Sequence, residues 1–409
     1  MGIAAGAVLT VLSVGIWIGL LSWRGQFWRA DQRLDLEVTE PSSWPSVCAV
    51  IPARNEADLL PETLRSLLTQ DYPGAVTVIL VDDQSTDGTA TVAQAVAQEL
   101  NQSDRLQILA AEPLPLGWTG KLWAMEQGTR KAQAQAINPP SDYLLLTDAD
   151  IEHDRSNLRQ LVAKAQHANL DLVSLMVKLR CESFWEQVLI PAFVFFFQKL
   201  YPFRWVNQPT HPTAAAAGGC ILIRNAALTR IGGIQAIRQA LIDDCALAQA
   251  IKSSGQSEQP GVKGGIWLGL SPSTRSLRPY PSLKTIWDMV ARTAFTQLNY
   301  SPLLLLGTLV AMTLIYIVPP VGAIAGLLTG SWLVAIAGLC GWLLMAFAYL
   351  PTLRFYGCSP LLAFGLPAIA WLYTLMTLDS ALRYWRGEGG AWKGRVYAET
   401  DLKVDAKHF

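Results

Sequence analysis

The chain alternates between long uncharged apolar stretches and segments whose apolar residues recur at strand or helix spacing. The second kind prevails at 45–260, where "VCAVIPA" and "VTVILVDD" have the short apolar runs of buried strands. The segments that follow them, "EADLLPETLRSLLTQ" and "TATVAQAVAQEL", have helical periodicity. Alternating strands and helices predict an α/β domain with a largely parallel sheet, whose ligand site lies beyond the carboxyl ends of the strands.

The uncharged stretches predict transmembrane helices at both ends of the chain. Residues 1–23 carry no charge and are long enough to cross a bilayer core, which takes about 20 helical residues. A cleaved signal peptide is the alternative, but no basic segment precedes the apolar run. Residues 301–382 contain three more apolar segments, which predict about three helices, although Pro319-Pro320 leaves a re-entrant element open.

The positions of basic residues indicate on which side of the membrane the α/β domain lies. The linker at 24–44 carries Arg24, Arg29 and Arg33, which by the positive-inside rule places the α/β domain in the cytoplasm. We therefore expect a multi-pass protein of the plasma (inner) membrane with its α/β domain on the cytoplasmic side. One span before this domain and three after it would put both termini outside, yet the tail at 383–409 is also basic and looks cytoplasmic. The number of crossings and the side of the tail stay open.

Composition and charge agree with a membrane protein and exclude several classes. Hydrophobic residues make up 51% of the 409 residues and charged residues only 16%. Lysine plus arginine equals aspartate plus glutamate, so the net charge gives no case for a nucleic-acid partner. The six cysteines form no Cys-x-x-Cys pair, which argues against zinc and against a disulfide framework.

Polar residues follow the first two predicted strands. Arg54 and Glu56 come after the first strand, and the Asp82-Asp83 pair comes after the second. Two adjacent carboxylates repel each other unless a basic group or a donor-rich ligand meets them, so this pair is a candidate site. The next residues, 85–87, are better interpreted as turn and capping residues.

The stretch "LLLTDADIEHD", at 144–154, brings an apolar strand to an end on four acids. Asp148 and Asp150 are two residues apart, so on a strand they share one face and can converge. Such a pair suits Mg²⁺ or Mn²⁺, with substrate phosphates completing the coordination. Glu152 and Asp154 are better interpreted as first-turn and capping residues of a following helix.

Several segments, in this order and spacing, resemble the inverting family 2 nucleotide-sugar glycosyltransferases, which include cellulose and chitin synthases. The resemblance covers roughly 45–260 and implies a GT-A-like fold with a mostly parallel mixed sheet. The N-terminal anchor, the three C-terminal apolar segments, "GWTGKLWA" and "WKGRVY" are most similar to the hopanoid-biosynthesis-associated membrane glycosyltransferases. The matching segments are "VIPARNEADLLPETLRSLLTQDYP", "VDDQSTDGT", "GWTGKLWAMEQG", "LLLTDADI", "AAGGCILIRNAALTRIGG" and "LIDDCALAQAIKSSG".

The resemblance implies where the nucleotide sugar and the metal ion bind. Asp148 and Asp150 would hold the ribose edge and the ion on the diphosphate, and Lys121 would offset charge on the leaving group. A solvated surface lysine is the alternative for Lys121. The residues expected to bind the nucleotide sugar are Pro52, Ala53, Arg54, Glu56, Asp83, Lys121 and Asp148.

The resemblance also implies a catalytic base. The family places it as the second acid of a pair, here Asp243 and Asp244, so we expect Asp244 to take the proton of the acceptor hydroxyl. An N-terminal helix cap is the alternative. Gly218 and Gly219 fall where the family lets the acceptor approach the backbone. Trp287 and Arg292 are weaker candidates for contacts with the acceptor or the diphosphate.

One departure from the family pattern indicates which kind of product the enzyme forms. Processive members carry Gln-x-x-Arg-Trp after the base, and "WDMVARTAFTQLNY" lacks it, which favours a single transfer over a polymer synthase. Residues 184–205 are aromatic and poorly charged, and they predict either a helix in the membrane interface or a core helix of the α/β domain. We expect a further interface segment at 261–300. An acceptor at the membrane surface would be a lipid.

The expected function is therefore a membrane-bound, metal-dependent, inverting glycosyltransferase that moves a single sugar from a UDP- or GDP-sugar to a lipid. Hopanoid or related isoprenoid acceptors follow from the resemblance alone. A processive polysaccharide synthase and a non-enzymatic nucleotide-sugar-binding membrane protein remain the alternatives.

Overall fold

The computed structural model describes residues 2–34, 40–134, 141–255, 265–388, 391–392 and 395–396. Most of the tail and part of "WKGRVY" lie outside these residues. The chain divides into two compact units, which we call the helical unit and the sheet unit. The helical unit comprises Met1–Asp31, Cys181–Arg204 and Tyr280–Gly390, and the sheet unit comprises Gln32–Arg180, Trp205–Pro279 and Ala391–Phe409.

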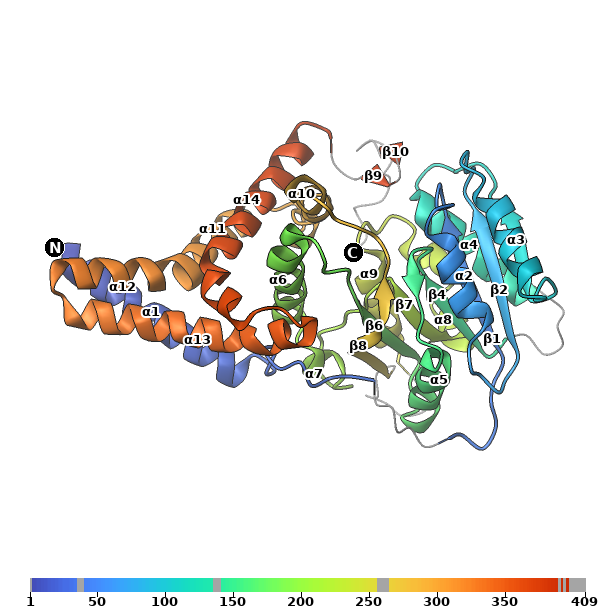
Figure 1. Cartoon of the computed structure of the whole chain (residues 1–409), viewed down its shortest axis with the longest axis horizontal. Coiled ribbons are helices and arrows are strands. Elements are labelled where there is room, and N and C mark those ends of the chain that lie inside the picture. Colours follow the sequence, from blue (N-terminus) through green and yellow to red (C-terminus); the bar gives the residue numbers. More distant parts are fainter. Residues whose placement is uncertain are drawn as a thin grey trace. The chain divides into compact units, whose positions relative to one another are not determined.

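An eight-stranded mixed sheet organises the sheet unit (Figure 1), in the order β3-β2-β1-β4-β7-β6-β8-β5. Neighbours β3, β2, β1 and β4 run parallel, as do β6 and β8, while β7 is antiparallel to β4 and β6, and β5 to β8. The mostly parallel mixed sheet expected from the sequence is confirmed. The strands are β1 (Val47–Ala53), β2 (Val76–Asp82), β3 (Leu106–Ala110), β4 (Tyr143–Thr147), β5 (Ile151–Glu152), β6 (Leu172–Lys178), β7 (Cys220–Arg224) and β8 (Ile266–Ser276).

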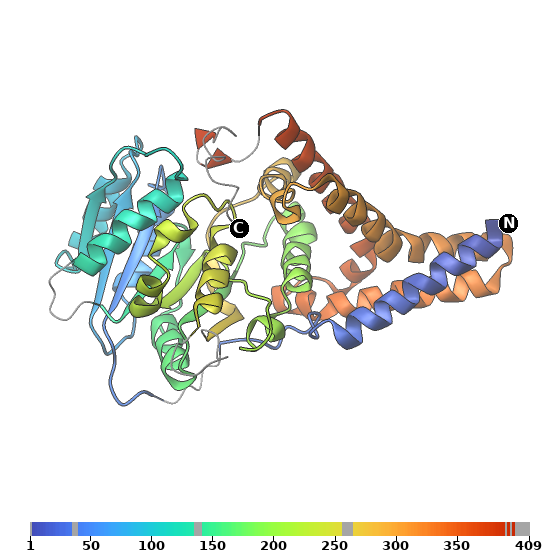
Figure 2. The same ribbon diagram turned by 180° about the vertical axis from the view of Figure 1, so that it is seen from behind.

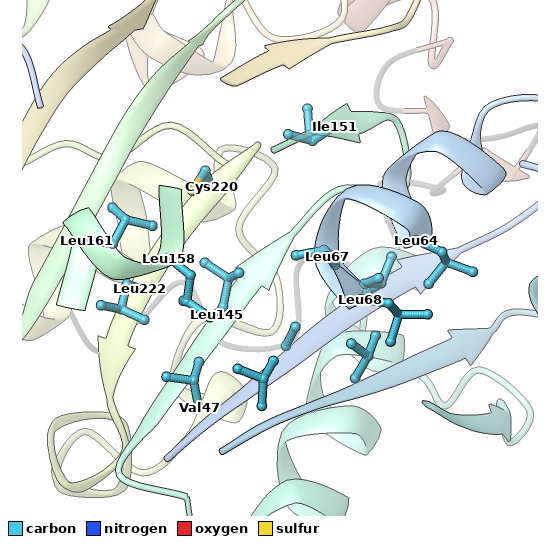
Figure 3. Close-up of a cluster of buried hydrophobic side chains, with 14 of the residues drawn as sticks. Val47, Leu64, Leu67, Leu68, Leu145, Ile151, Leu158, Leu161, Cys220 and Leu222 are labelled. Atoms are coloured by element: carbon cyan, nitrogen blue, oxygen red, sulfur yellow. The ribbon is translucent and has the colours of Figure 1, made fainter. Parts of the chain in front are cut away.

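Helices cover both faces of this sheet, and alternate side chains of β1 point to the two faces. Val47 lies on the face that packs against helices α2 and α5 (Figure 3), where leucines of both helices fill the core. Val50 points to the other face, where α4 approaches so closely that a Cβ on Gly128 would lie 2.4 Å from its Cγ1. The helices are α2 (Leu60–Leu68), α3 (Thr89–Glu99), α4 (Gly120–Ala134), α5 (Asn157–His167), α8 (Asn225–Arg230), η1 (Ile234–Ile237) and α9 (Asp243–Ser254).

The sheet extends past residue 260, where we expected the α/β domain to end. Strand β8, at 266–276, lies between β6 and β5, and its first six residues are buried. The expected interface segment at 261–300 therefore contains a core strand of the sheet unit in its first half. The reason is that a strand buried on both faces is a short apolar run, here "IWLGL", which carries no amphipathic signal.

The helical unit contains four helices that are long and apolar enough to span a membrane, among the residues described. They are Gly6–Trp23, Pro302–Thr329, Trp332–Tyr356 and Pro360–Trp385, one before strand β1 in the chain and three after strand β8. The unit is built from α1 (Gly2–Trp23), α6 (Phe184–Leu200), α10 (Leu283–Ala291), η2 (Thr296–Leu298), α11 (Pro302–Met312), η3 (Thr313–Ile317), α12 (Val318–Thr329), α13 (Trp332–Tyr356), η4 (Pro360–Gly365) and α14 (Leu366–Trp385), with α7 (Phe203–Val206) at its chain boundary.

The Pro319-Pro320 pair does not break the second of these spans. A π-helical segment, η3, precedes the prolines, and α12 continues the helix beyond them. In a regular α-helix the carbonyl of Ile315 would accept a hydrogen bond from residue 319, which as proline has no N–H. The indole Nε1 of Trp17 donates to that carbonyl instead, at 2.9 Å. The re-entrant break that the sequence left open is absent from this described segment.

Small residues let α1, α12 and α13 pack side by side (Figure 2). A Cβ on Gly326 would lie 2.3 Å from the backbone N of Ala335, and one on Gly338 would lie 2.3 Å from the backbone N of Ala323. Close backbone approach at small residues is typical of helices that associate in a bilayer. Helix α6, for which the sequence left two interpretations, contacts α10, α13 and α14 within this unit and is not a core helix of the sheet unit.

Candidate active site

The loops after β1 and β2 hold each other by hydrogen bonds. The N–H of Asn55 donates to Ser85 Oγ at 2.9 Å, and the N–H of Thr86 donates to Asn55 Oδ1 at 2.9 Å. Asp87 accepts from the backbone and the side chain of Thr89 at the start of α3. Residues 85–87 thus hold the turn, as the sequence predicted, and they fix the edge of the sheet where the site lies.

The two adjacent acids after β2 have separate partners. Asp83 is 1% exposed. Arg54 Nη1 lies 3.6 Å from its carboxylate and donates to its backbone carbonyl at 2.6 Å. Asp82 turns away and accepts from the N–H of Ser85 at 3.1 Å. The basic group that the pair requires is therefore Arg54, at the end of β1.

The acids of "LLLTDADIEHD" do not share a strand face. Strand β4 ends at Thr147, so Asp148 and Asp150 lie in the turn that follows, and each meets a different cation. The sequence-based geometry was wrong here because the period of two holds only while the backbone remains extended. Glu152 lies on β5, where it pairs with Arg275, so its expected place in a helix is also wrong.

Asp154 caps the turn that leads into α5. Its Oδ1 accepts from the N–H of Ser156 at 2.9 Å and from the Ser156 hydroxyl at 2.6 Å. This is a local capping role, as the sequence predicted for Asp154.

Lys121, in the first turn of α4, joins acids from two other elements. Its Nζ lies 3.0 Å from Asp148 Oδ1 in the β4–β5 turn and 3.2 Å from Asp243 Oδ2 at the start of α9. Burial by itself would lower the pKa of Lys121, but Asp148 and Asp243 outweigh it and hold the pKa above its usual range. Lys121 is therefore a fixed positive charge within an acidic cluster, and the interpretation of a solvated surface lysine is wrong.

Asp244 is a buried carboxylate with a raised pKa. Its Oδ2 accepts from the N–H of Gly218 at 2.9 Å, and its Oδ1 from the N–H of Cys245 at 2.7 Å. Burial and the neighbouring charge of Asp243 raise its pKa to about 6, while Lys121 and the two N–H donors oppose the rise. The side chain does bond the first turn of α9, as a helix cap would, but it also reaches across to Gly218.

These groups meet in one pocket. Its polar side combines Lys121 with acids from two elements, and its apolar side comes from β1, β4, β7, η1, α4 and α9. The lining residues are Pro52, Lys121, Met125, Leu146, Thr147, Asp148, Gly218, Ile221, Ile237, Asp243, Asp244 and Leu247.

Only some of the remaining predicted residues lie at the pocket. Gly218 lies at the pocket, and a Cβ there would lie 3.3 Å from Lys121 Nζ. Gly219 packs instead against the core, where its carbonyl accepts from Thr147 Oγ1 at 2.7 Å. Trp287 and Arg292 belong to the helical unit, so their expected contacts with the acceptor or the diphosphate stay a prediction.

Sequence reasoning missed Arg278. Its Nε donates to Asp150 Oδ2 at 2.9 Å, and its Nη2 donates to both oxygens of Glu56, at 2.7 and 2.9 Å. This arginine lies more than 100 residues from either partner in the chain, next to no recognisable motif, so only the pairing of β8 with β5 could have revealed it.

Acidic side chains gather around two cationic side chains at this edge of the sheet. Five carboxylates, from Glu56, Asp148, Asp150, Asp243 and Asp244, face two cationic side chains, Lys121 and Arg278. Among the residues described, no group of three or more acidic, histidine or cysteine side chains is placed to hold a metal ion by itself. The donor set suits an ion whose coordination is completed by substrate oxygens.

Comparison with known proteins points to one family. The sequence model of glycosyl transferase family 2 matches residues 48–232. A 4,4'-diaponeurosporenoate glycosyltransferase of Staphylococcus haemolyticus is 30% identical over 144 residues, 34% of this chain and 33% of that protein. An N-acetylglucosaminyltransferase of Bradyrhizobium elkanii is 31% identical over 153 residues, 34% of this chain and 76% of that protein. For three of the similar proteins, the match covers only 22% to 33% of their length.

The fold is similar to that of a solved mannosyltransferase. The structure of this enzyme from Pyrobaculum calidifontis, in complex with GDP-Man and Mn²⁺, aligns with a TM-score of 0.53 at 17% sequence identity. The alignment covers 93% of this chain and 99% of that chain. The likeness confirms the GT-A-like fold expected from the sequence.

The charges around Asp244 predict opposite shifts of its pKa from about 6. Asp243→Asn removes the like charge, so the pKa should fall; Lys121→Met removes the opposite charge, so the pKa should rise. The measurement is a pH titration of ¹³C-aspartate-labelled protein by NMR, with the Asp244 resonance assigned by its absence in Asp244→Asn. Shifts in the same direction for both variants would contradict this electrostatic account.

Proposed function

We propose that this chain, which belongs to glycosyl transferase family 2, moves a single sugar from a nucleotide-diphosphate sugar to a lipid, with inversion at the anomeric carbon. The observation that carries the proposal is the pocket in which Asp244, with a pKa raised to about 6, faces Lys121 and Asp148.

The nucleotide sugar would bind at the carboxyl ends of β1, β2 and β4. Asp83, held by Arg54, offers carboxylate oxygens to the base or the ribose, and Asp148 offers them to the ribose edge. Pro52 and Ala53 end β1 beside these groups, and Pro52 lines the pocket. The Pyrobaculum calidifontis enzyme was solved with GDP-Man, which supports a donor of this class.

Asp244 is the proposed catalytic base. A base with a pKa of about 6 is ionised at neutral pH and still accepts a proton as the acceptor hydroxyl attacks. The N–H groups of Gly218 and Cys245 fix both carboxylate oxygens, which limits the directions from which a hydroxyl can approach. Asp243 adds negative charge beside the base and keeps Lys121 in place.

Lys121 is the proposed counter-charge for the leaving diphosphate. Its ammonium is held by acids on two sides at the pocket wall, where it can stabilise the negative charge that develops as the glycosidic bond breaks. A divalent cation held by Asp148 and Asp150 would share this role. The chemistry that it supplies is neutralisation of the diphosphate.

The acceptor is proposed to be a lipid because the chain carries four helices long enough to span a membrane. The aromatic helix α6 belongs to the same unit as these helices. By the positive-inside rule we propose the cytoplasmic face of the plasma (inner) membrane. The Staphylococcus haemolyticus relative is a diaponeurosporenoate glycosyltransferase, which supports an acceptor other than a growing polysaccharide. A hopanoid or related isoprenoid lipid remains our proposal.

Replacing the base tests the proposed chemistry. Asp244→Asn should lower transfer about 10²- to 10⁴-fold, the usual contribution of a general base, while nucleotide binding changes little. The measurements are the transfer rate and the affinity for UDP and GDP by calorimetry. Asp104→Asn, an exposed acid in the same unit, should behave as the unmodified chain. Near-normal turnover in Asp244→Asn would refute the assignment.

The function as a whole is tested with membranes that contain the protein. They are incubated with a panel of labelled UDP- and GDP-sugars, and the labelled product is identified by mass spectrometry. We expect one sugar per lipid molecule, formed with Mg²⁺ or Mn²⁺ and lost with EDTA. A labelled polymer would favour the processive alternative. The absence of labelled product and of sugar-nucleotide hydrolysis with every donor would favour a binding protein.

A further inference from the structure

Arg278 forms an uncommon link between two acids of the proposed donor site. Its guanidinium contacts both oxygens of Glu56 through Nη2 and Oδ2 of Asp150 through Nε. Glu56 is 8% exposed and Asp150 is 7% exposed. Charge-assisted hydrogen bonds at these distances are among the stronger polar contacts in proteins, and burial strengthens them further.

The pairing of two strands fixes this contact. Ile151 pairs with Ser276, and the N–H of Leu277 continues the ladder by donating to the carbonyl of Asp150 at 2.8 Å. The next residue, Arg278, is thereby placed beside the Asp150 side chain, which also accepts from Ser276 Oγ at 3.3 Å. The arginine is thus positioned by the backbone of the sheet unit itself.

A divalent ion and this guanidinium would compete for the same carboxylate. Asp150 is the residue we expect to ligate the cation, yet its Oδ2 is the atom that accepts from Arg278. A carboxylate oxygen that already accepts charge-assisted hydrogen bonds has less electron density and less room for a metal ion. Binding of an ion at Asp150 therefore requires Arg278 to leave the carboxylate or to share it with the ion.

We propose that Arg278 occupies the cation's carboxylate in the metal-free enzyme and makes binding of a divalent cation depend on the nucleotide diphosphate. The inference rests on the proposed function, because it assumes that Asp150 is a cation ligand. Without a diphosphate, Arg278 outcompetes a weakly held ion at Asp150. With a diphosphate, phosphate oxygens add ligands for the ion and a partner for the guanidinium, so Asp150 is released.

The arrangement has a consequence for the order of binding. Arg278 keeps its contacts with Glu56 when it leaves Asp150, so its charge stays at the site to meet the diphosphate. In the bare site the guanidinium lies between Glu56 and Asp150 and offsets the repulsion of the two carboxylates. Free cation and free nucleotide should each bind weakly, and the two together should bind cooperatively.

The test is a titration with Mn²⁺ followed by electron paramagnetic resonance on the purified full-length protein. It is done first with Mn²⁺ alone and then with UDP or GDP present. In Arg278→Met, the affinity for Mn²⁺ alone should rise about tenfold. This factor is the low end of the change that an adjacent opposite charge makes to the proton affinity of a carboxylate. The gain in Mn²⁺ affinity that UDP or GDP brings should shrink by a similar factor.

Two further variants keep the result interpretable. Arg278→Gln removes the charge but retains an amide donor for Glu56, so it should show the same changes if Arg278→Met fails to fold. Arg275→Met is the matched control, since Arg275 lies three residues earlier and pairs with Glu152 on the exposed edge of the sheet. It should leave both Mn²⁺ affinities unchanged.

The outcomes separate this inference from the proposed function. An unchanged or weaker affinity for Mn²⁺ alone in the Arg278 variants would overturn the competition and leave Arg278 as a structural partner of Glu56. Failure of the unmodified protein to bind Mn²⁺ even with UDP and GDP would also overturn it, since Arg278 would then replace the cation. Neither result depends on transfer of a sugar, which the labelled-lipid experiment measures separately.

Discussion

The candidate site depends on one ammonium group held among carboxylates. Lys121 comes from α4, Asp148 from the turn after β4, and Asp243 from the start of α9, so three elements meet at a single Nζ. Lys121 opposes the rise in the pKa of Asp148 and of Asp244 that burial causes, so without its charge these two acids would take up protons more readily. The position of Lys121 rests in turn on α4, which packs closely on β1 at Gly128. The close packing of α4 on the sheet therefore also fixes the position of the charge on which the pocket depends.

Local pattern and motif order predicted many of the elements and the charged residues that line the pocket. The first strands and helices follow from periodicity, because burial and secondary structure impose it. The apolar helices at both ends follow from uncharged runs long enough to cross a bilayer, and the mixed sheet follows from the family resemblance. Lys121, Asp148, Asp243 and Asp244 were named as candidates, and the structure brings them to one pocket. Their roles in binding and catalysis remain proposals.

What the sequence could not predict depends on contacts between distant residues or on where a strand ends. Asp148 and Asp150 were placed on one strand face because the end of β4 at Thr147 has no local signal. Arg278 became visible only through the register of β8 with β5. The same strand shows why a boundary at 260 was too early: its apolar core is too short to be distinguished from a loop segment by pattern alone.

The central claim is that Asp244 activates an acceptor hydroxyl for direct attack on the anomeric carbon, opposite the leaving diphosphate. One displacement inverts the configuration, whereas two successive displacements through a covalent intermediate would retain it. The direct measurement is the anomeric configuration of the purified glycolipid, read from its proton NMR coupling and compared with that of the nucleotide sugar. Donors with an α linkage should give a β-glycoside. An α-linked product would contradict the account.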